Sequence, residues 1–127
     1  MINKSILHHV HKGGFSEEEL YGAYKIFLGT LVSEPRLKII KLLMKGKKNV
    51  SELIEELKMD QTAVSHNLER LRRCGFVQSE IDGKFRFYKL NEKTIKPLIE
   101  IIEEHMSNYC IHILRATKEE KWNKIIP

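Results

Sequence analysis

The sequence lacks the features that mark exported or membrane-embedded proteins. No apolar run approaches the roughly 20 residues that a transmembrane helix needs. The opening stretch, MINKSILHHVHKGG, has no apolar segment followed by a small-residue cleavage site, so we identify no signal peptide. Two cysteines, Cys74 and Cys110, do not make a disulfide framework. We therefore expect a cytoplasmic protein without a membrane partner.

Patterns typical of enzymes are also absent. The chain has no glycine-rich phosphate-binding loop and no nucleophile elbow. Its acidic residues are spread along the expected helices, so they form no catalytic pair. Internal repeats and low-complexity tracts are absent as well, and 127 residues suit one domain with a modest core. We expect a protein that is not an enzyme.

Basic residues are in moderate excess. Lys and Arg outnumber Asp and Glu by 22 to 17, which gives a net charge of +5 and an isoelectric point near 9.2. A composition of 42% hydrophobic and 31% charged residues is typical of a folded soluble domain. Such a charge balance favours polyanionic partners if the basic residues cluster.

Helical spacing of apolar residues governs the first part of the chain after an expected N-terminal arm, residues 1–14. Ser16 and Glu19 have the S-x-x-E spacing of a capping box, which predicts a helix to about Val32. The stretch Ser33-Glu34-Pro35 predicts the start of a second helix, which ends at Gly46.

Two further helices are predicted between residues 51 and 75. Ser51 is expected to cap a short third helix. Asp60 is expected to cap a fourth helix over residues 61–74, and Gly75 to end it. The apolar residues at i, i+4 and i+7 predict its buried stripe, namely Val64, Leu68 and Leu71.

The period then changes to that of strands. Residues 76–90 carry aromatic and β-branched residues on both sides of Asp82-Gly83, which predicts a β-hairpin. A final long helix is expected to begin after Thr94, because that start places Pro97 in the first turn. We expect its apolar stripe to comprise Ile95, Leu98, Ile102, Tyr109 and Ile113. The predicted fold class is mainly α with a small β-hairpin, a winged helix-turn-helix.

Polar and basic side chains share one face of the predicted helix 61–74. In a helix-turn-helix the second helix enters the major groove of DNA, where polar side chains near its N-terminus can bond base edges. Basic side chains further along, or at the hairpin tip, suit phosphates or the minor groove. The alternative is an ordinary solvated surface. The predicted contacts with double-stranded DNA are Gln61, Thr62, Ser65, His66, Arg70, Arg73, Lys84 and Arg86. Glu69 is expected to accept from a cytosine amino group or to avoid the DNA.

At these residues the chain resembles the ArsR/SmtB family of prokaryotic winged-helix repressors, in DQTAVSHNLERLRRCGFV and EIDGKFRFYKL. SEPRLKIIKLL is similar to the second helix of that family, and the resemblance spans roughly residues 17–115. It implies a homodimer paired through the first and last helices, which binds a palindromic operator and is released by an effector. We expect the domain at residues 15–117 and a tail at 118–127.

The resemblance also implies where a metal would bind. A family thiolate site with Cys-x-Cys in the third helix is absent here, where the chain reads Ser51-Glu52-Leu53. The positions of the family's zinc site correspond to Glu92, Thr94, His105 and Asn108. Of these, His105 fits fully and Glu92 is chemically plausible, whereas Thr94 and Asn108 are poor replacements.

The stretch HMSNYCIH, residues 105–112, contains two imidazoles and a thiol. Side chains on one regular helix share an ion only at i, i+3 or i+4 spacing, so no two of these are expected to chelate from a single helix. A site for Zn, Ni, Co or Cu would need a second segment, such as the N-terminal arm. The candidate ligands are His105, Cys110, His112, His8 and His11. The alternatives are that these residues pack at a dimer interface without a ligand, or that they have a redox or other small-molecule role.

Two other functions also fit the predicted fold. One is a winged-helix module that assembles proteins, and the other is an architectural DNA-binding protein that tolerates any sequence. The expected function remains that of a DNA-binding transcriptional repressor.

Overall fold

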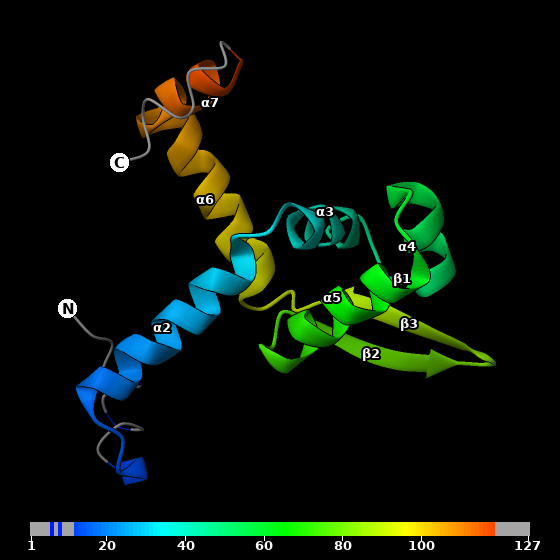
Figure 1. The fold of residues 1–127 in the computed structure, drawn as a ribbon, viewed down its shortest axis with the longest axis horizontal. Helices are drawn as coiled ribbons and strands as arrows, with labels where there is room; N and C mark the ends of the chain where they lie inside the picture. Colours follow the sequence, from blue (N-terminus) through cyan, green and yellow to red (C-terminus); the bar gives the residue numbers. More distant parts are fainter. Residues whose placement is uncertain (1–5, 7, 9–11, 119–127) are drawn as a thin grey trace. The chain divides into compact units, whose positions relative to one another are not determined.

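The computed structural model describes residues 6, 8 and 12–118. It is mainly helical, with one three-stranded sheet (Figure 1). The chain forms two compact units, Met1–Lys89 and Leu90–Pro127. Within the described residues, no helix combines the length and apolar character needed to cross a bilayer. The predicted fold class, a winged helix-turn-helix that is mainly α, is confirmed.

The first two helices begin where the sequence predicts. Helix α2 spans Glu17–Leu31, and its capping box joins Ser16 Oγ to the Glu19 N–H and Glu19 Oε1 to the Ser16 N–H, each at 3.1 Å. Helix α3 spans Glu34–Leu43 and is capped by Ser33, with proline in its first turn. Both starts follow from side chains that satisfy backbone N–H groups left without helical partners.

The third predicted helix begins earlier than expected. Helix α4 spans Val50–Leu57, and its cap is Asn49, so the prediction of Ser51 as the cap is wrong. Asn49 Oδ1 accepts from the Glu52 N–H at 2.8 Å, and Glu52 Oε1 accepts from the Asn49 N–H at 3.0 Å. Because this capping box satisfies two N–H groups at once, it places Ser51 inside the first turn.

Helix α5 spans Gln61–Arg73, within one residue of the prediction. Asp60 Oδ1 caps it by accepting a first-turn backbone N–H at 2.7 Å. At its end Gly75 has a φ of 74°, and the Phe76 N–H donates to the Leu71 carbonyl at 2.9 Å. This is the Schellman arrangement, in which a left-handed residue, usually glycine, stops the helix.

Helices α3, α4 and α5 enclose the core of the first unit. Burying one large aliphatic or aromatic side chain stabilises a fold by about 1.5–3 kcal/mol. The predicted stripe of α5 is confirmed, since all three members are buried. The core consists of Ile39, Ile40, Leu43, Leu53, Val64, Leu68, Leu71, Phe76 and Val77.

The hairpin consists of β2 (Val77–Asp82) and β3 (Phe85–Leu90). Its two-residue loop is Gly83-Lys84, one residue later than the predicted Asp82-Gly83. Gly83 has a φ of 65°, and a glycine with positive φ at the first loop position is typical of type II′ turns. The sequence did not reveal a further strand, β1 (Lys48–Asn49), which pairs with β3 so that Lys48 faces Tyr88 and Asn49 faces Phe87.

The start of the last helical region agrees with the prediction. Helix α6 spans Ile95–Tyr109, Thr94 stands at its N-cap position, and Pro97 lies in its first turn. The Thr94 side chain makes no cap bond, however, and Asn91 Oδ1 accepts from the Lys93 and Thr94 N–H groups instead.

The expectation of one continuous helix to the end of the domain is wrong. Helix α6 stops at Tyr109, Cys110 has a φ of −128°, and a separate helix, α7, spans Ile111–Lys118. No glycine or proline marks this break, which is why the sequence pattern did not show it. The predicted apolar stripe is correct for Ile95, which is buried, but not for Tyr109, which is 76% exposed.

Candidate nucleic-acid interface

The N-terminal half of α5 presents its polar side chains to solvent. Asp60 fixes the start of the helix, and the buried stripe fixes its rotation, so the opposite face must point outward. Hydroxyl, amide and imidazole groups on that face can donate to or accept from base edges. The exposed residues at this end are Gln61, Thr62, Ser65 and His66, as predicted.

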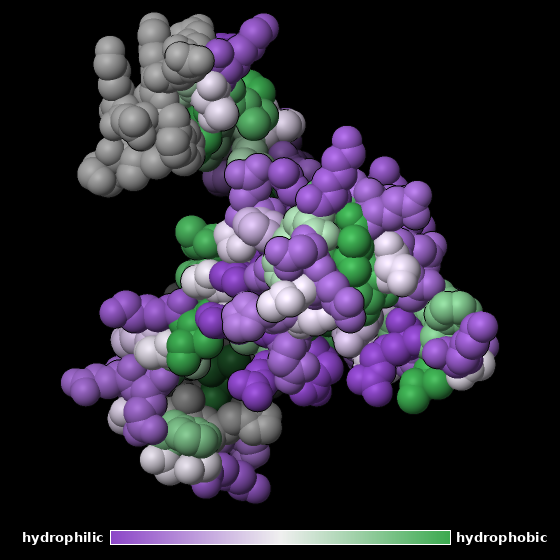
Figure 2. All heavy atoms as spheres, turned by 45° about the vertical axis from the view of Figure 1, so that its right-hand side comes forward, coloured by the Kyte–Doolittle hydropathy of each residue, from purple (hydrophilic) through white to green (hydrophobic). Residues whose placement is uncertain are grey.

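The second half of α5 carries the basic side chains. Four residues of this helix, His66, Glu69, Arg70 and Arg73, line a shallow hollow of about 330 Å³. The structure therefore brings together three of the predicted DNA contacts, one polar and two basic, around a single carboxylate. Hydrophilic residues likewise predominate on the face of the molecule shown in Figure 2.

Glu69 accepts hydrogen bonds from Arg72 and Arg73. Its Oε1 accepts from Arg72 Nη2 at 2.7 Å and from Arg73 Nε at 3.2 Å, and its Oε2 accepts from Arg72 Nε at 3.0 Å. Hydrogen bonds from Arg72, together with the nearby positive charges, lower the pKa of Glu69 from 4.5 to about 2. Glu69 thus offsets part of the positive charge of Arg72 and Arg73.

The Arg70 guanidinium is hydrogen-bonded to α2. Its Nε donates to Thr30 Oγ1, 3.1 Å away at the end of α2. Spacing along α5 did not reveal this bond, because Thr30 lies 40 residues earlier. The signal available was chemical, namely a threonine hydroxyl among the apolar residues of the last turns of α2.

The hairpin tip is both basic and apolar. Lys84 lies in the loop, with its Nζ 5.5 Å from the centre of the Phe85 ring, and Arg86 is exposed on β3. Ile81 is 71% exposed beside them. At the base of the hairpin, Lys47 Nζ lies 2.9 Å from Glu80 Oε1. The tip thus offers cations on a narrow projection, as a wing requires.

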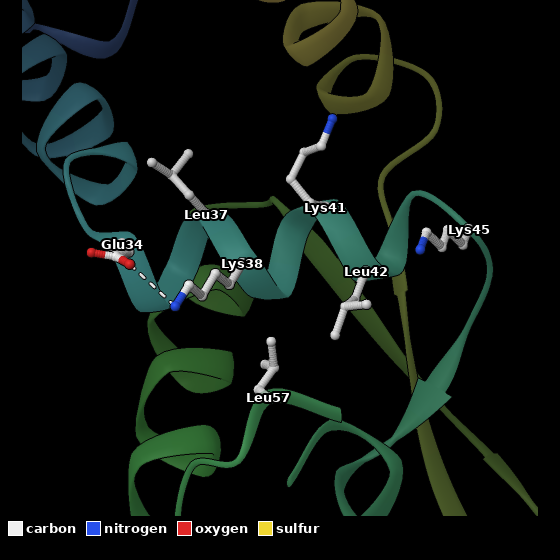
Figure 3. Close-up of a pocket in the computed structure, with 7 residues that line it drawn as sticks. All are labelled: Glu34, Leu37, Lys38, Lys41, Leu42, Lys45 and Leu57. Carbon is white, nitrogen blue, oxygen red and sulfur yellow. Dashed lines mark ion pairs between the residues drawn. The ribbon is translucent and has the colours of Figure 1, made fainter. Parts of the chain in front are cut away.

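A groove between α3 and the end of α4 lies apart from this surface (Figure 3). It has a volume of about 410 Å³, and its lining residues include Leu42 and Leu57, which point toward each other, and three lysines. Lys41 points away from these leucines, and Lys38 pairs with Glu34 at 3.1 Å. Because its polar groups do not converge, the groove has no arrangement that would orient a small ligand.

The structure brings two of the candidate metal ligands together. Cys110 Sγ lies 3.4 Å from His105 Nε2, and the His105 ring lies 5.4 Å from that of Tyr109. The expectation that no two of the three side chains at residues 105–112 can chelate from a single helix does not apply to this pair. It assumed a regular helix, whereas the chain leaves the helix at Cys110 and turns the thiol back toward His105.

Two of the other candidates, His112 and His8, are described residues. His112 lies on α7, beyond the break, and is exposed. His8 is exposed, and His11 falls outside the described residues. Within residues 6, 8 and 12–118, no group of three or more His, Cys, Asp or Glu side chains is placed to hold one metal ion.

Comparison with known proteins identifies the family. Residues 33–79 match the family described as bacterial regulatory protein, arsR family. The HTH-type transcriptional regulator MJ1325 of Methanocaldococcus jannaschii is 36% identical over 70 residues, which cover 54% of this chain and 79% of that protein.

Two further relatives carry descriptive names. The transcriptional activator HlyU of Vibrio cholerae is 32% identical over 61% of this chain and 71% of its own. Its solved structure is 30% identical and has a TM-score of 0.60 over 73% of this chain and 98% of that one. A Streptomyces lividans protein described as a probable mercury resistance operon repressor is 29% identical over 58% of each chain.

The family match covers the segment that contains the helix-turn-helix, and the matched structure is similar over most of this chain. The chain belongs to the ArsR family of bacterial regulatory proteins and is a winged helix-turn-helix transcriptional regulator.

Proposed function

We propose that this protein binds a palindromic DNA operator as a homodimer. Helix α5 enters the major groove, and the β2–β3 hairpin contacts the backbone or minor groove as a wing. Residues 15–117 form the DNA-binding and dimerising domain, with residues 1–14 as an arm and 118–127 as a tail. The proposed contacts are Gln61, Thr62, Ser65, His66, Arg70, Arg73, Lys84 and Arg86.

The observation that carries this proposal is the division of α5 into two faces. Val64, Leu68 and Leu71 are buried, while the polar side chains of the first turns are exposed. A helix held rigidly by one face can present the other to base edges in a reproducible position. Basic side chains further along the helix suit the phosphates that flank the groove.

The dimer would form through α2 and α6. On α2 the apolar side chains of Tyr21, Tyr24 and Leu28 follow one another at i, i+3 and i+7, and they are 45–59% exposed. Ile101 and Tyr109 of α6 are also exposed. Large exposed apolar faces mark interaction sites, and a second copy of the chain offers matching faces of the same kind.

The sign of regulation is proposed to be repression. A dimer seated on an operator within a promoter blocks access to that DNA unless it also contacts the polymerase. The relatives include both an activator, HlyU, and a protein described as a repressor, so family membership leaves both signs open. A promoter–reporter fusion measures the sign: expression should rise when the gene for this protein is deleted.

His105 and Cys110 form half of a proposed transition-metal effector site. In a tetrahedral zinc site, with bonds of about 2.0–2.1 Å to nitrogen and 2.3 Å to sulfur, the two donor atoms lie about 3.6 Å apart. The 3.4 Å between His105 Nε2 and Cys110 Sγ is close to that separation. Imidazole with thiolate suits Zn, Ni, Co or Cu. The same pair in the second copy would complete four ligands.

The DNA proposal is tested with an operator selected from a random-sequence pool by the wild-type protein. Fluorescence anisotropy at about 0.15 M salt should show the operator binding at least about 10³-fold more tightly than a random duplex. Equal affinities would instead indicate an architectural DNA-binding protein. No binding to any duplex at low salt would indicate a protein-assembly module.

Two variants distinguish a proposed base contact from a proposed phosphate contact. His66→Ala should weaken operator binding by about 1–3 kcal/mol and leave random DNA unaffected, because it removes a base contact. Lys84→Ala should weaken binding to both DNAs alike and reduce the salt slope by about 1, because it removes a phosphate contact. The same pattern from both variants would contradict this assignment.

The metal proposal is tested by binding stoichiometry on the full chain, purified without an affinity tag. One Zn, Ni, Co or Cu ion per two chains is expected, and either Cys110→Ser or His105→Ala should abolish it. Cys74→Ser is the matched control and should bind metal normally. Metal binding that survives both site variants would overturn the proposal.

A further inference from the structure

Thr30 is the buried polar side chain of the described residues, with an exposed fraction of 0%. It lies in the last turn of α2, and three groups surround its hydroxyl oxygen. The Ile26 carbonyl lies 2.8 Å away, Arg70 Nε 3.1 Å and Cys74 Sγ 3.4 Å. Two of these three belong to α5 or its C-cap, so a single hydroxyl joins the end of α2 to the end of α5.

The bonding capacity of this hydroxyl is used completely. A threonine hydroxyl has one hydrogen to donate and two lone pairs that accept. The Ile26 carbonyl can only accept, so it takes the hydrogen, and Arg70 Nε can only donate, so it takes a lone pair. The second lone pair is left for the thiol hydrogen of Cys74. Cys74 thus acts here as a donor.

Arg36 provides a second link at the same point. Its Nε donates to the Thr30 carbonyl at 2.7 Å and its Nη2 to the Gly29 carbonyl at 3.4 Å. These carbonyls are at the C-terminal end of α2, where a positive charge is favourable. Arg36 Nη1 also donates to Asn67 Oδ1 on α5, at 3.2 Å.

The contacts that join Thr30 and Arg36 to α5 all lie on one side of that helix. Asn67, Arg70 and Cys74 follow one another at i, i+3 and i+7, so they lie on one side of the helix. At 100° per residue that side falls between the buried stripe and the exposed face that carries His66. Apolar packing alone is tolerant of small rotations, whereas hydrogen bonds weaken steeply as their angles change.

We propose that Thr30 and Arg36 are positioning residues for DNA reading. They set the rotation of α5 relative to the end of α2, and with it the direction in which the base-contacting side chains point. Neither residue touches DNA. The inference rests on the proposed role of α5 as the helix that enters the major groove.

The test compares three threonine variants for affinity to the selected operator and to a random duplex. Thr30→Val keeps the shape but removes the hydroxyl, leaving Arg70 and Cys74 without their acceptor. Thr30→Ser keeps the hydroxyl. Thr117→Val is the matched control, because Thr117 makes the same bond to the carbonyl four residues earlier, at 2.9 Å, on an exposed helix.

Thr30→Val should lower operator affinity about tenfold, the equivalent of about 1.4 kcal/mol, and change random-duplex affinity by less than about twofold. Thr30→Ser and Thr117→Val should both keep the wild-type ratio of the two affinities. A role in stability alone would lower both affinities together through the folded fraction, so the ratio distinguishes the two.

An unchanged ratio in Thr30→Val, or an equal loss on both DNAs, would overturn the inference. If Thr30→Val does not fold, Arg36→Lys carries the test, since it keeps the charge but cannot bridge Gly29, Thr30 and Asn67 together. The same decrease in the ratio of operator affinity to random-duplex affinity is then expected. Should the wild-type protein itself show no operator preference, the proposed function fails, which is a separate result.

Discussion

At the scale of single residues, Glu69 determines how much positive charge α5 offers to DNA. It accepts hydrogen bonds from both Arg72 and Arg73. Its pKa of about 2 means that it remains ionised at any pH at which the protein would work. On the proposed DNA-binding face, this carboxylate therefore acts on Arg72 and Arg73 and would reduce sequence-independent attraction.

Replacing this carboxylate should strengthen non-specific binding. Glu69→Gln releases Arg72 and Arg73, so affinity for a random duplex should rise and the plot of log affinity against log salt should steepen by about 1. Anisotropy titrations at several salt concentrations measure both effects. Lys38 with Glu34 offers a control pair, and Glu34→Gln should alter neither quantity. A shallower slope in Glu69→Gln would contradict the assignment.

The same residue predicts a pH dependence of stability. Because the pKa of Glu69 is lower in the folded state, its contribution is present above the ordinary value of 4.5. It is lost as the pH falls toward about 2. The melting temperature of the wild type should therefore exceed that of Glu69→Gln above pH 4.5, and the difference should vanish near pH 2. A constant difference across this range would show that ionisation of Glu69 is irrelevant.

At the scale of elements, capping decides where the helix-turn-helix begins. Asn49 serves both as the cap of α4 and as a member of β1, which pairs with β3. One residue thus joins the start of the motif to the wing, through its side chain as the cap and through its backbone in the strand pairing. Ser51 has the right chemistry for a cap, but Asn49 is followed at the right distance by Glu52.

Removing the two candidate caps should have unequal effects. Asn49→Ala should lower the free energy of unfolding by about 1 kcal/mol, because it leaves a first-turn N–H without its acceptor. Ser51→Ala, the matched control two residues away, should change it by less than about 0.5 kcal/mol. Urea denaturation followed by circular dichroism measures both. Equal losses would mean that α4 does not depend on this capping box.

The break between α6 and α7 is the element-scale feature on which the proposed metal site depends. In a continuous helix His105 and Cys110 would point to different sides. Cys110 leaves the helix, and its thiol comes within 3.4 Å of the imidazole. A metal that binds this pair would fix the backbone at the break, and this links metal binding to the conformation of the chain end.

At the scale of the whole molecule, the apolar surface of α2 is part of the proposed dimer interface. Tyr21, Tyr24 and Leu28 are exposed on it, and a second copy is the proposed occupant. Palindromic operators match two-fold symmetric proteins, so loss of the dimer should also reduce operator affinity.

A charge placed on this surface should separate the dimer. Leu28→Glu buries a carboxylate at the proposed interface, and sedimentation at micromolar concentration should show a monomer that binds the operator at least about tenfold more weakly. Ile81→Glu is the control, since Ile81 is also apolar and exposed but lies on the hairpin. It should remain dimeric. A dimeric Leu28→Glu would place the interface elsewhere.

Much of this architecture was predictable from local spacing. Ser16, Asp60 and Gly75 mark helix ends through bonds to residues a few positions away, so their pattern is visible in the chain itself. Buried stripes of α5 are visible for the same reason. The two-residue strand β1 was not, because Asn49 pairs with Phe87 and Lys48 with Tyr88, partners that lie 38 and 40 residues later, and no local rule indicates such pairing.

The sequence by itself determined the order of the elements, the buried and exposed faces of α5, and the resemblance to the ArsR family. These depend on interactions between near neighbours, whose geometry the helix and strand periods dictate. Only the tertiary structure decided that Thr30 joins Arg36, Arg70 and Cys74, and that the chain breaks at Cys110 beside His105. Such contacts depend on the directions in which packed elements meet, or on one irregular backbone angle, and neither follows from spacing along the chain.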